Sequence, residues 1–191
     1  MGNLTLYFNN YDMKAFKLTR ISVFALLFGG IFFKICAQDI QLNEDRLTTT
    51  LYFVRHAEKI KTDSSDKNPS LTAEGFERAT NWSRVFKDVD FDIIYSTNFK
   101  RTQLTAKPTA DSKNLPITNL DYKNLNFEEF INQHKGQTVL VVGHSNTTPY
   151  MVNKITGNTN YEDMNENDNG SLFVVQLTKE GKSSVIRLHI N

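Results

Sequence analysis

Arginine and histidine residues follow three segments that have the composition of buried β-strands. The pair Arg55-His56 follows residues 48–54, Arg101 lies a short way beyond residues 91–95, and His144 comes after residues 138–142. Guanidinium groups pair with phosphoryl oxygens, and an imidazole can attack phosphorus as a covalent nucleophile. These residue types therefore predict a site for an anionic phosphate group, provided that the fold brings the three segments together.

Strand and helix patterns alternate along most of the chain. Apolar and β-branched runs predict strands, and apolar residues at helical spacing predict helices. The strands are expected at 48–54, 91–95, 117–120 and 138–142, the helices at 72–86, 98–106, 126–134 and 146–155, and a final hairpin at 171–178 and 183–190. Thr72 is expected to cap the first helix, and Pro108 to help end the second.

This order of elements predicts an α/β fold, a three-layer sandwich with a mostly parallel central sheet, helices on both faces and a C-terminal antiparallel hairpin. One domain, residues 48–191, accounts for the pattern. In such a sheet, ligands bind beyond the carboxyl ends of the strands. We therefore expect the arginines and histidines that follow the strands to meet at one edge: Arg55, His56, Arg101 and His144.

The first 37 residues differ in composition from the rest of the chain. A short basic segment from Met13 precedes an apolar run at 21–33 and a small residue at Ala37, as in a secretory signal peptide. We expect translation to start at Met13, cleavage to follow Ala37, and residues 38–47 to form a linker. The product is then expected to be periplasmic or secreted, and whether residues 1–12 are translated stays open.

The apolar run is too short for a stable membrane anchor, since a spanning helix needs about 20 apolar residues. Lipidation of Cys36 is disfavoured because the bulky Ile35 precedes it. Cleavage after Ala37 would remove this single cysteine. Cysteine nucleophiles, thiolate zinc sites and disulfides are therefore excluded for the mature chain.

Charge and loop composition argue against two further kinds of ligand. The 191 residues carry 22 basic and 21 acidic side chains, a net charge of +1, without a basic stripe, so no nucleic-acid partner is expected. The acidic loop 163–170 has glycine at its eighth position, and Val174 stands where a calcium loop needs a glutamate, so we expect a solvated loop and no metal site. His134 and His189 have no second histidine at ligand spacing and are expected to be structural.

Four sequence blocks surround the predicted site residues. They are Leu51–Glu58, Leu71–Gly75, Ile94–Thr97 with Lys100–Ala106, and Val141–Ser145. Their order and content resemble the histidine phosphatase superfamily, the phosphoglycerate mutase-like proteins. Thr62 stands where mutase-type members place an asparagine, and long insertions are lacking, so the chain is more similar to the small phosphatase branch.

The resemblance implies a role for each of four residues. His56 would be phosphorylated transiently, and His144 would bind the same phosphoryl group in its charged form. Arg55 and Arg101 would hold the phosphoryl oxygens. Phosphoryl transfer needs mainly in-line positioning and charge stabilisation, which these four groups supply without a metal or another cofactor.

The chain departs from the family pattern at the position of the general acid. Ser145 stands where acid-phosphatase members have an aspartate. Asp121 and Glu58 are the candidates for this role, although Glu58 is equally suited to being the structural partner of an arginine. Without an acid, substrates with good leaving groups would be preferred, such as phosphohistidine, acyl phosphates or aryl phosphates.

The leading hypothesis is an exported, metal-independent phosphomonoesterase that acts on a small-molecule phosphate ester through a phosphohistidine intermediate on His56. One alternative is a phosphatase of protein phosphohistidine. The other is a non-catalytic binder of phosphorylated ligands. The sequence names neither the substrate nor the oligomeric state.

Overall fold

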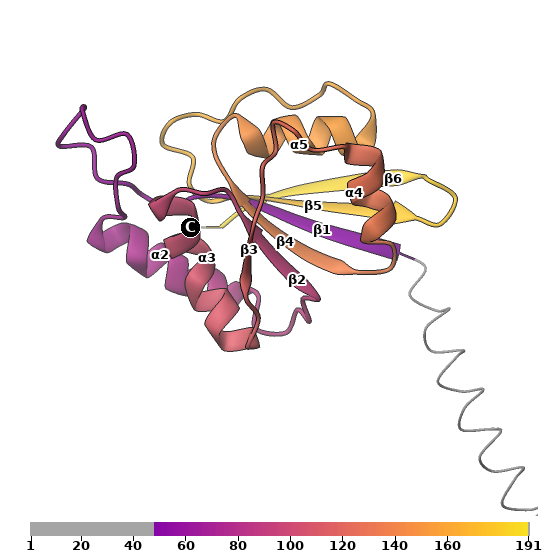
Figure 1. The fold of residues 1–191 in the computed structure, drawn as a ribbon, viewed down its shortest axis with the longest axis horizontal. Helices are drawn as coiled ribbons and strands as arrows, with labels where there is room; N and C mark the ends of the chain where they lie inside the picture. The colour runs from indigo at the N-terminus through magenta and orange to yellow at the C-terminus, as the bar shows by residue number, and fades with distance from the viewer. Residues whose placement is uncertain (1–47, 191) are drawn as a thin grey trace, which may run out of the picture. The chain divides into compact units, whose positions relative to one another are not determined.

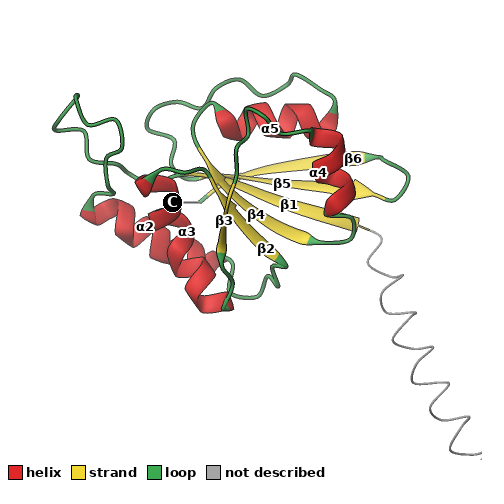
Figure 2. Cartoon of the chain, viewed as in Figure 1, coloured by secondary structure: helices red, strands yellow, loops and turns green. Residues whose placement is uncertain are grey.

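The computed structural model describes residues 48–190, which form a twisted central sheet with helices on both faces (Figures 1 and 2). The strands are β1 (Thr48–Arg55), β2 (Ile93–Ser96), β3 (Ile117–Asn119), β4 (Thr138–Gly143), β5 (Ser171–Thr178) and β6 (Ser183–His189). The helices are α2 (Ala73–Val85), α3 (Lys100–Lys113), α4 (Phe127–Gln133) and α5 (Thr147–Thr156). The predicted signal peptide, with its start at Met13 and its cleavage after Ala37, lies outside the described residues.

The strand order in the sheet is β3-β2-β4-β1-β5-β6. Strands β1, β2, β3 and β4 pair in parallel, whereas β5 pairs antiparallel with both β1 and β6. The central strand β1 places Phe53 opposite Val141 of β4 on one side and opposite Phe173 of β5 on the other. The expected fold, a mostly parallel sheet between two helical layers with a C-terminal hairpin, is confirmed.

Two apolar cores fill the space between the sheet and its helices. Helices α4 and α5 cover one core, which contains Phe53 and Phe173, and α2 and α3 cover the other, which contains Trp82 and Phe86. Trp82 stacks on Phe86 with ring centroids 5.6 Å apart. Because each large buried side chain stabilises the fold by about 1.5–3 kcal/mol, these cores hold the sheet rigid under the site. Within residues 48–190, no helix has the length and apolar composition to cross a membrane.

The helix ends follow the predicted capping at α2 but not at α3. Thr72 caps α2, its Oγ1 accepting a hydrogen bond from the Gly75 amide at 3.0 Å. The prediction that Pro108 helps to end the next helix is wrong. Pro108 lies inside α3, which continues to Lys113 and ends at Asn114 in the left-handed conformation with φ of 53°. A proline removes one intrahelical hydrogen bond, and burial of the following turn through Thr109 and Ala110 offsets that loss.

The strand directions bring two kinds of segment to one edge of the sheet. The carboxyl ends of the parallel strands β1, β2 and β4 lie there. Because β5 runs antiparallel to β1, its amino end lies at the same edge, with Leu172 opposite Val54. The loop that precedes β5 therefore also reaches this edge.

Candidate active site

Arg55 and His56 lie where β1, in the middle of the sheet, ends. The His56 amide donates a hydrogen bond to the Gly143 carbonyl at 2.9 Å, so the β1–β4 pairing continues past the last strand residue. Arg55 is 2% exposed and His56 is 3% exposed. The sheet and its buried surroundings therefore fix both side chains.

The His56 ring is held in one tautomer. Its Nδ1 lies 2.7 Å from the Ala57 carbonyl oxygen, which can only accept a hydrogen bond. The hydrogen of the neutral ring is therefore on Nδ1, and Nε2 keeps its lone pair. The His56 carbonyl in turn accepts a hydrogen bond from Asn169 Nδ2 at 2.8 Å. An imidazole in this state presents Nε2 as a nucleophile.

Burial and nearby cations lower the pKa of both site histidines. Burial is the main cause for each, and it lowers the pKa of His56 to about 3 and that of His144 to about 4, with further lowering from the charges of Arg55 and Arg101. Both rings are therefore neutral at pH 7 in the ligand-free site. The resemblance implied a charged His144 when the phosphoryl group is bound, and a positive ring beside two arginines needs such a negative ligand for compensation.

His144 follows β4 and belongs to a chain of hydrogen bonds. Arg101 Nη2 donates to His144 Nδ1 at 3.5 Å, and an arginine has no acceptor, so the ring hydrogen is on Nε2. Nε2 donates to Thr97 Oγ1 at 2.9 Å, and Thr97 donates to Thr102 Oγ1 at 3.1 Å. Thr97 and Thr102 are buried, so the chain fixes the orientation of the ring. Neither threonine was named as a site residue from the sequence.

Arg101 lies in the first turn of α3 and stacks on Phe99, with its guanidinium carbon 4.5 Å from the ring centroid. Its Nε and Nη1 are buried without a hydrogen-bond partner. Thr105 Oγ1 accepts from the Ala57 amide at 2.9 Å and donates to the Arg101 carbonyl at 2.7 Å, which ties this turn of α3 to the end of β1. Because unpaired buried donors are costly, the site is built for an acceptor-rich anion.

The loop before β5 packs directly on Arg55. Arg55 Nη1 donates to the carbonyls of Asn165 at 2.8 Å and Asp168 at 3.2 Å, and Nη2 pairs with Glu166 Oε2 at 3.3 Å. Asn169 of the same loop is buried against His56. The prediction that 163–170 is a solvated loop is therefore wrong for this part of its surface. The signal that could have found these residues is the antiparallel pairing of β5, which turns the start of that strand toward the site.

Glu58 is held in place by α2. Its Oε1 accepts from Arg78 Nε at 2.7 Å, and its carbonyl accepts from the Thr72 amide at 2.9 Å. Gly75 packs so closely on the same carbonyl that a Cβ there would collide with it. Glu58 is thus the partner of an arginine, one of the two roles considered for it. It also lines the smaller pocket over His56, and its Oε2 is buried without a hydrogen-bond partner.

Asp121 does not reach the site. It is exposed, and it accepts hydrogen bonds from Asn124 Nδ2 at 2.7 Å and from the Lys123 amide at 3.2 Å. These hydrogen bonds lower the pKa of Asp121, whereas a general acid needs a carboxyl group that keeps its proton. Asp121 is also absent from the residues that line the pockets over His56.

Two adjoining pockets, of about 440 and 330 Å³, open over His56. Both are lined by Arg55, His56, Lys59 and Glu166. The larger pocket adds Phe99, Arg101, Tyr122, Lys123, His144, Ser145, Asn146 and Asp163. The four residues predicted from the sequence as one site therefore line one pocket, whose size suits a small phosphate ester.

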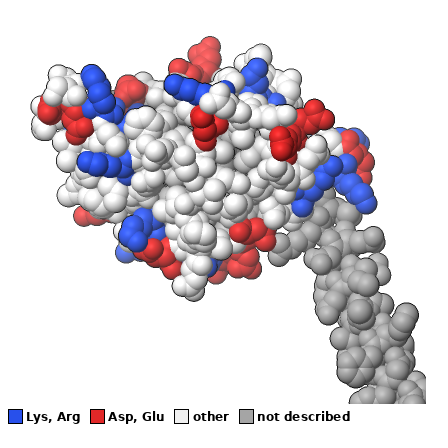
Figure 3. Space-filling model, in the orientation of Figure 1, with Lys and Arg blue, Asp and Glu red and all other residues white. Residues whose placement is uncertain are grey.

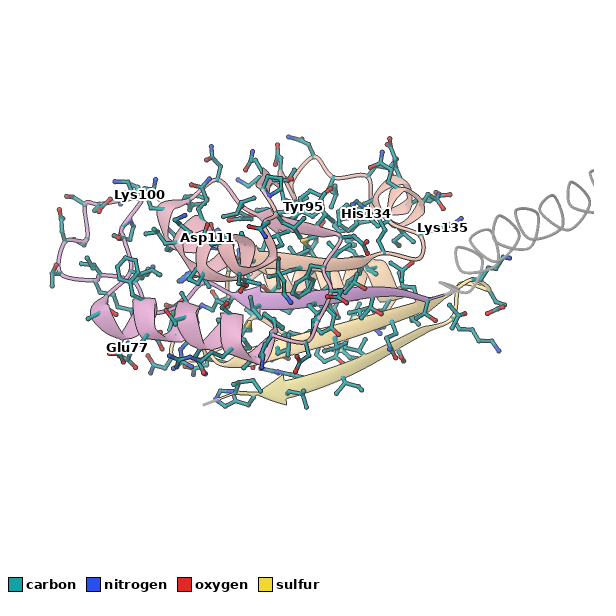
Figure 4. The ribbon with its side chains drawn as sticks, turned by 90° about the horizontal axis from the view of Figure 1, so that it is seen from below. Glu77, Tyr95, Lys100, Asp111, His134 and Lys135 are labelled. Atoms are coloured by element: carbon teal, nitrogen blue, oxygen red, sulfur yellow. The ribbon has the colours of Figure 1, made fainter. Side chains whose placement is uncertain are left out.

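The two remaining histidines lie outside these pockets. His134 is buried at the end of α4, where Nδ1 lies 2.7 Å from the Phe130 carbonyl and Nε2 lies 3.0 Å from the Tyr95 hydroxyl (Figure 4). His189 is exposed on β6, with Nδ1 3.5 Å from Asp168 Oδ1. Both positions are structural.

A metal ion would need a cluster of ligating side chains, and a nucleic acid would need a continuous basic surface. Within residues 48–190, no group of three or more histidine, cysteine, aspartate or glutamate side chains is placed to hold a metal ion. Basic and acidic side chains are interspersed on the face seen in Figure 3. That face therefore presents no continuous basic surface.

The model of the histidine phosphatase superfamily (branch 1) matches residues 51–122. This match and the fold confirm the resemblance of the chain to the histidine phosphatase superfamily. No curated protein sequence matches the chain.

Solved structures of phosphatases share this fold. The protein histidine phosphatase SixA, complexed with tungstate, is 19% identical with a TM-score of 0.59, over 73% of this chain and 96% of that one. The alpha-ribazole phosphatase from Shigella flexneri is 18% identical with a TM-score of 0.57, over 74% and 96%. A mycobacterial glucosyl-3-phosphoglycerate phosphatase is 10% identical with a TM-score of 0.61, over 75% and 100%. At these identities the likeness shows the fold alone.

Proposed function

We propose that the chain is an exported phosphomonoesterase that hydrolyses a small phosphate ester through a phosphohistidine intermediate on His56. One observation carries the proposal: a neutral His56 with a free Nε2 lone pair shares a pocket with Arg101, whose buried Nε and Nη1 have no partner. A nucleophile without a proton and donors without an acceptor are together complementary to a phosphate group.

The first chemical step forms the phosphoenzyme. Nε2 of His56 attacks phosphorus in line with the ester oxygen, and the phosphorus–oxygen bond breaks with its electron pair on the departing ester oxygen. Arg55 and Arg101 bind the phosphoryl oxygens and spread the developing charge. The arriving anion offsets the charges of the two arginines, so His144 can then take up a proton and donate a hydrogen bond. The Nδ1 hydrogen bond to Ala57 keeps His56 in place as Nε2 becomes bonded to phosphorus.

The second step returns the enzyme to its resting state. Water attacks the phosphorus of phospho-His56, and the phosphorus–nitrogen bond breaks with its electron pair returning to Nε2. The same arginines hold the phosphoryl group in both steps, so no metal ion is required for charge stabilisation.

A phosphatase of protein phosphohistidine is the second candidate. It is supported by the position of Asp121, which lines neither pocket over His56, and by the ion pair that engages Glu58 Oε1 with Arg78. A phosphorylated imidazole departs without strong acid assistance. The fold of SixA, a protein histidine phosphatase, agrees with this candidate but does not distinguish it.

Turnover by the purified mature chain, residues 38–191, tests the proposal. We expect hydrolysis of p-nitrophenyl phosphate and of at least one alkyl phosphate from a panel of sugar phosphates and nucleotides. Hydrolysis of phosphohistidine peptides without any of these esters would favour the second candidate. Binding of phosphate esters without turnover of any substrate would point to a non-catalytic binder.

A further inference from the structure

We propose that Glu166 is the general acid of the first step and the general base of the second. This inference rests on the proposed function. It assigns the role to the loop before β5, where no proton donor was expected from the sequence.

Hydrogen bonds to the loop backbone fix the position of the Glu166 main chain. Arg55 Nη1 holds the carbonyls of Asn165 and Asp168, which flank Glu166 in the chain, at 2.8 and 3.2 Å. The Met164 amide donates to the Ser145 carbonyl at 2.9 Å, next to His144. The loop is therefore anchored to the ends of both β1 and β4.

The Asp168 side chain provides a second anchor. It accepts hydrogen bonds from Ser171 Oγ at 2.7 Å and from Arg187 Nη2 at 2.9 Å. Burial alone would raise the pKa of Asp168, but these hydrogen bonds outweigh it and lower the pKa, so the carboxylate stays charged and paired at pH 7. Glu166 thus projects from a loop that is fixed on both sides.

The Glu166 side chain lies at the mouth of the site. It is 67% exposed, its Oε2 is 3.3 Å from Arg55 Nη2, and it lines both pockets over His56. His56 is at the buried end, so an ester attacked in line by Nε2 must have its leaving oxygen directed away from the sheet, toward the mouth. Glu166 is on that side.

Substrate binding changes the partner of Glu166. In the ligand-free site its carboxylate pairs with Arg55 Nη2, while Arg55 Nε is buried without a partner, so a phosphoryl group that binds both nitrogens displaces the carboxylate. The displaced carboxyl group then lies at the mouth of the pocket, on the side of the leaving oxygen. The same event that fills the arginine therefore frees Glu166 to act on that oxygen.

The proton and electron balance closes over the two steps. As Nε2 of His56 bonds to phosphorus, the phosphorus–oxygen bond breaks, its electron pair stays on the ester oxygen, and the Glu166 carboxyl group protonates that oxygen to give the alcohol. In the second step the Glu166 carboxylate takes a proton from the attacking water, and the phosphorus–nitrogen electron pair returns to Nε2. Inorganic phosphate leaves and the carboxyl group is restored.

The leaving-group dependence of the Glu166→Gln variant tests this assignment. General acid catalysis contributes about 100- to 10,000-fold when the leaving group is poor. We expect kcat/KM for an alkyl phosphate, such as glycerol phosphate, to fall by about 100-fold or more, and kcat/KM for p-nitrophenyl phosphate to fall less than about fivefold, because p-nitrophenolate leaves without a proton. Glu166→Asp should recover part of the alkyl phosphate activity.

Glu162→Gln is the matched control, since Glu162 is exposed in the same loop and lines neither pocket. It should leave both rates unchanged. Equal losses of kcat/KM for both substrates in Glu166→Gln would mean a positioning role. A uniform gain in affinity for both substrates would mean that Glu166 only competes with phosphate for Arg55. Either result overturns the proposal. If the wild-type chain hydrolysed neither ester, the proposed function itself would fail, and the acid with it.

Discussion

We expect Arg101 to lower the free energy of unfolding and to be essential for activity. Its replacement by methionine separates the two effects. Its Nε and Nη1 are buried without a partner in the ligand-free site. Each unsatisfied buried donor costs about 1–3 kcal/mol, and more for a charged group. Methionine keeps most of the side-chain volume and removes both donors.

The stacking on Phe99 opposes this gain. The guanidinium carbon lies 4.5 Å from the Phe99 ring centroid, a contact that stabilises by about 0.5–2 kcal/mol. With about 4 kcal/mol for the two donors and about 1 kcal/mol for the stacking, the net result for Arg101→Met is a rise in the free energy of unfolding of about 3 kcal/mol. For a chain of this size, that corresponds to a melting temperature higher by about 6–12 °C.

Activity should move in the opposite direction. Loss of one preorganised donor to the transition state costs about 100- to 1,000-fold in kcat. Urea denaturation and p-nitrophenyl phosphate turnover of the same preparations measure both quantities. A variant that is less stable than the wild type would refute the reasoning, because it would mean that the Arg101 donors are satisfied in the ligand-free protein.

Three further predictions concern pH, metals and processing. The folded pKa values of His56 and His144 lie below the unfolded value of about 6.5, so the unfolded chain binds more protons between pH 4 and 6.5. The free energy of unfolding should therefore rise with pH across this window, and His56→Gln should reduce the slope. A slope that His56→Gln leaves unchanged would contradict the lowered pKa. Activity should survive EDTA, and a loss that magnesium or zinc restores would show that charge stabilisation by Arg55 and Arg101 is not sufficient. Expression of the full gene should give a periplasmic or secreted protein that begins at Gln38, and N-terminal sequencing that finds Met13 or Met1 in a soluble cytoplasmic pool would contradict export.

The parallel part of the fold and the meeting of four residues could be predicted because they follow from local patterns. Buried strand runs before Arg55 and His144 indicate parallel central strands, and parallel strands share the edge where their carboxyl ends lie. The structure brings Arg55, His56, Arg101 and His144 into one pocket, as that reasoning requires.

The role of the loop before β5 could not be predicted from such patterns. Residues 163–170 are polar and carry no apolar periodicity, so composition alone indicates solvent. Their contact with Arg55 depends on the antiparallel pairing of β5 with β1, a tertiary feature with a sequence separation of more than 100 residues. The continuation of α3 through Pro108 has a similar origin, because packing of the final turn overrides the local preference of proline.

The charge of His144 also depended on tertiary surroundings. Its neutral state follows from burial near Arg101 and Arg55, which the sequence places 43 and 89 positions away. Tertiary and local contacts also decide how the two acid candidates, Glu58 and Asp121, are held. Glu58 is taken up by Arg78 of α2, and Asp121 by its own turn.

Trapping of the phosphoenzyme tests the covalent mechanism most directly. The wild-type chain would be mixed with a phosphate ester labelled in its phosphoryl group and quenched in alkali, because phosphoramidate bonds hydrolyse in acid. We predict a base-stable phosphohistidine that maps to His56, is absent from His56→Ala and is retained by His189→Ala, whose exposed ring lies outside the pockets. If wild-type protein that turns over the ester carries no such label, or if His56→Ala keeps a tenth or more of the wild-type rate, water attacks phosphorus directly and His56 is not the nucleophile.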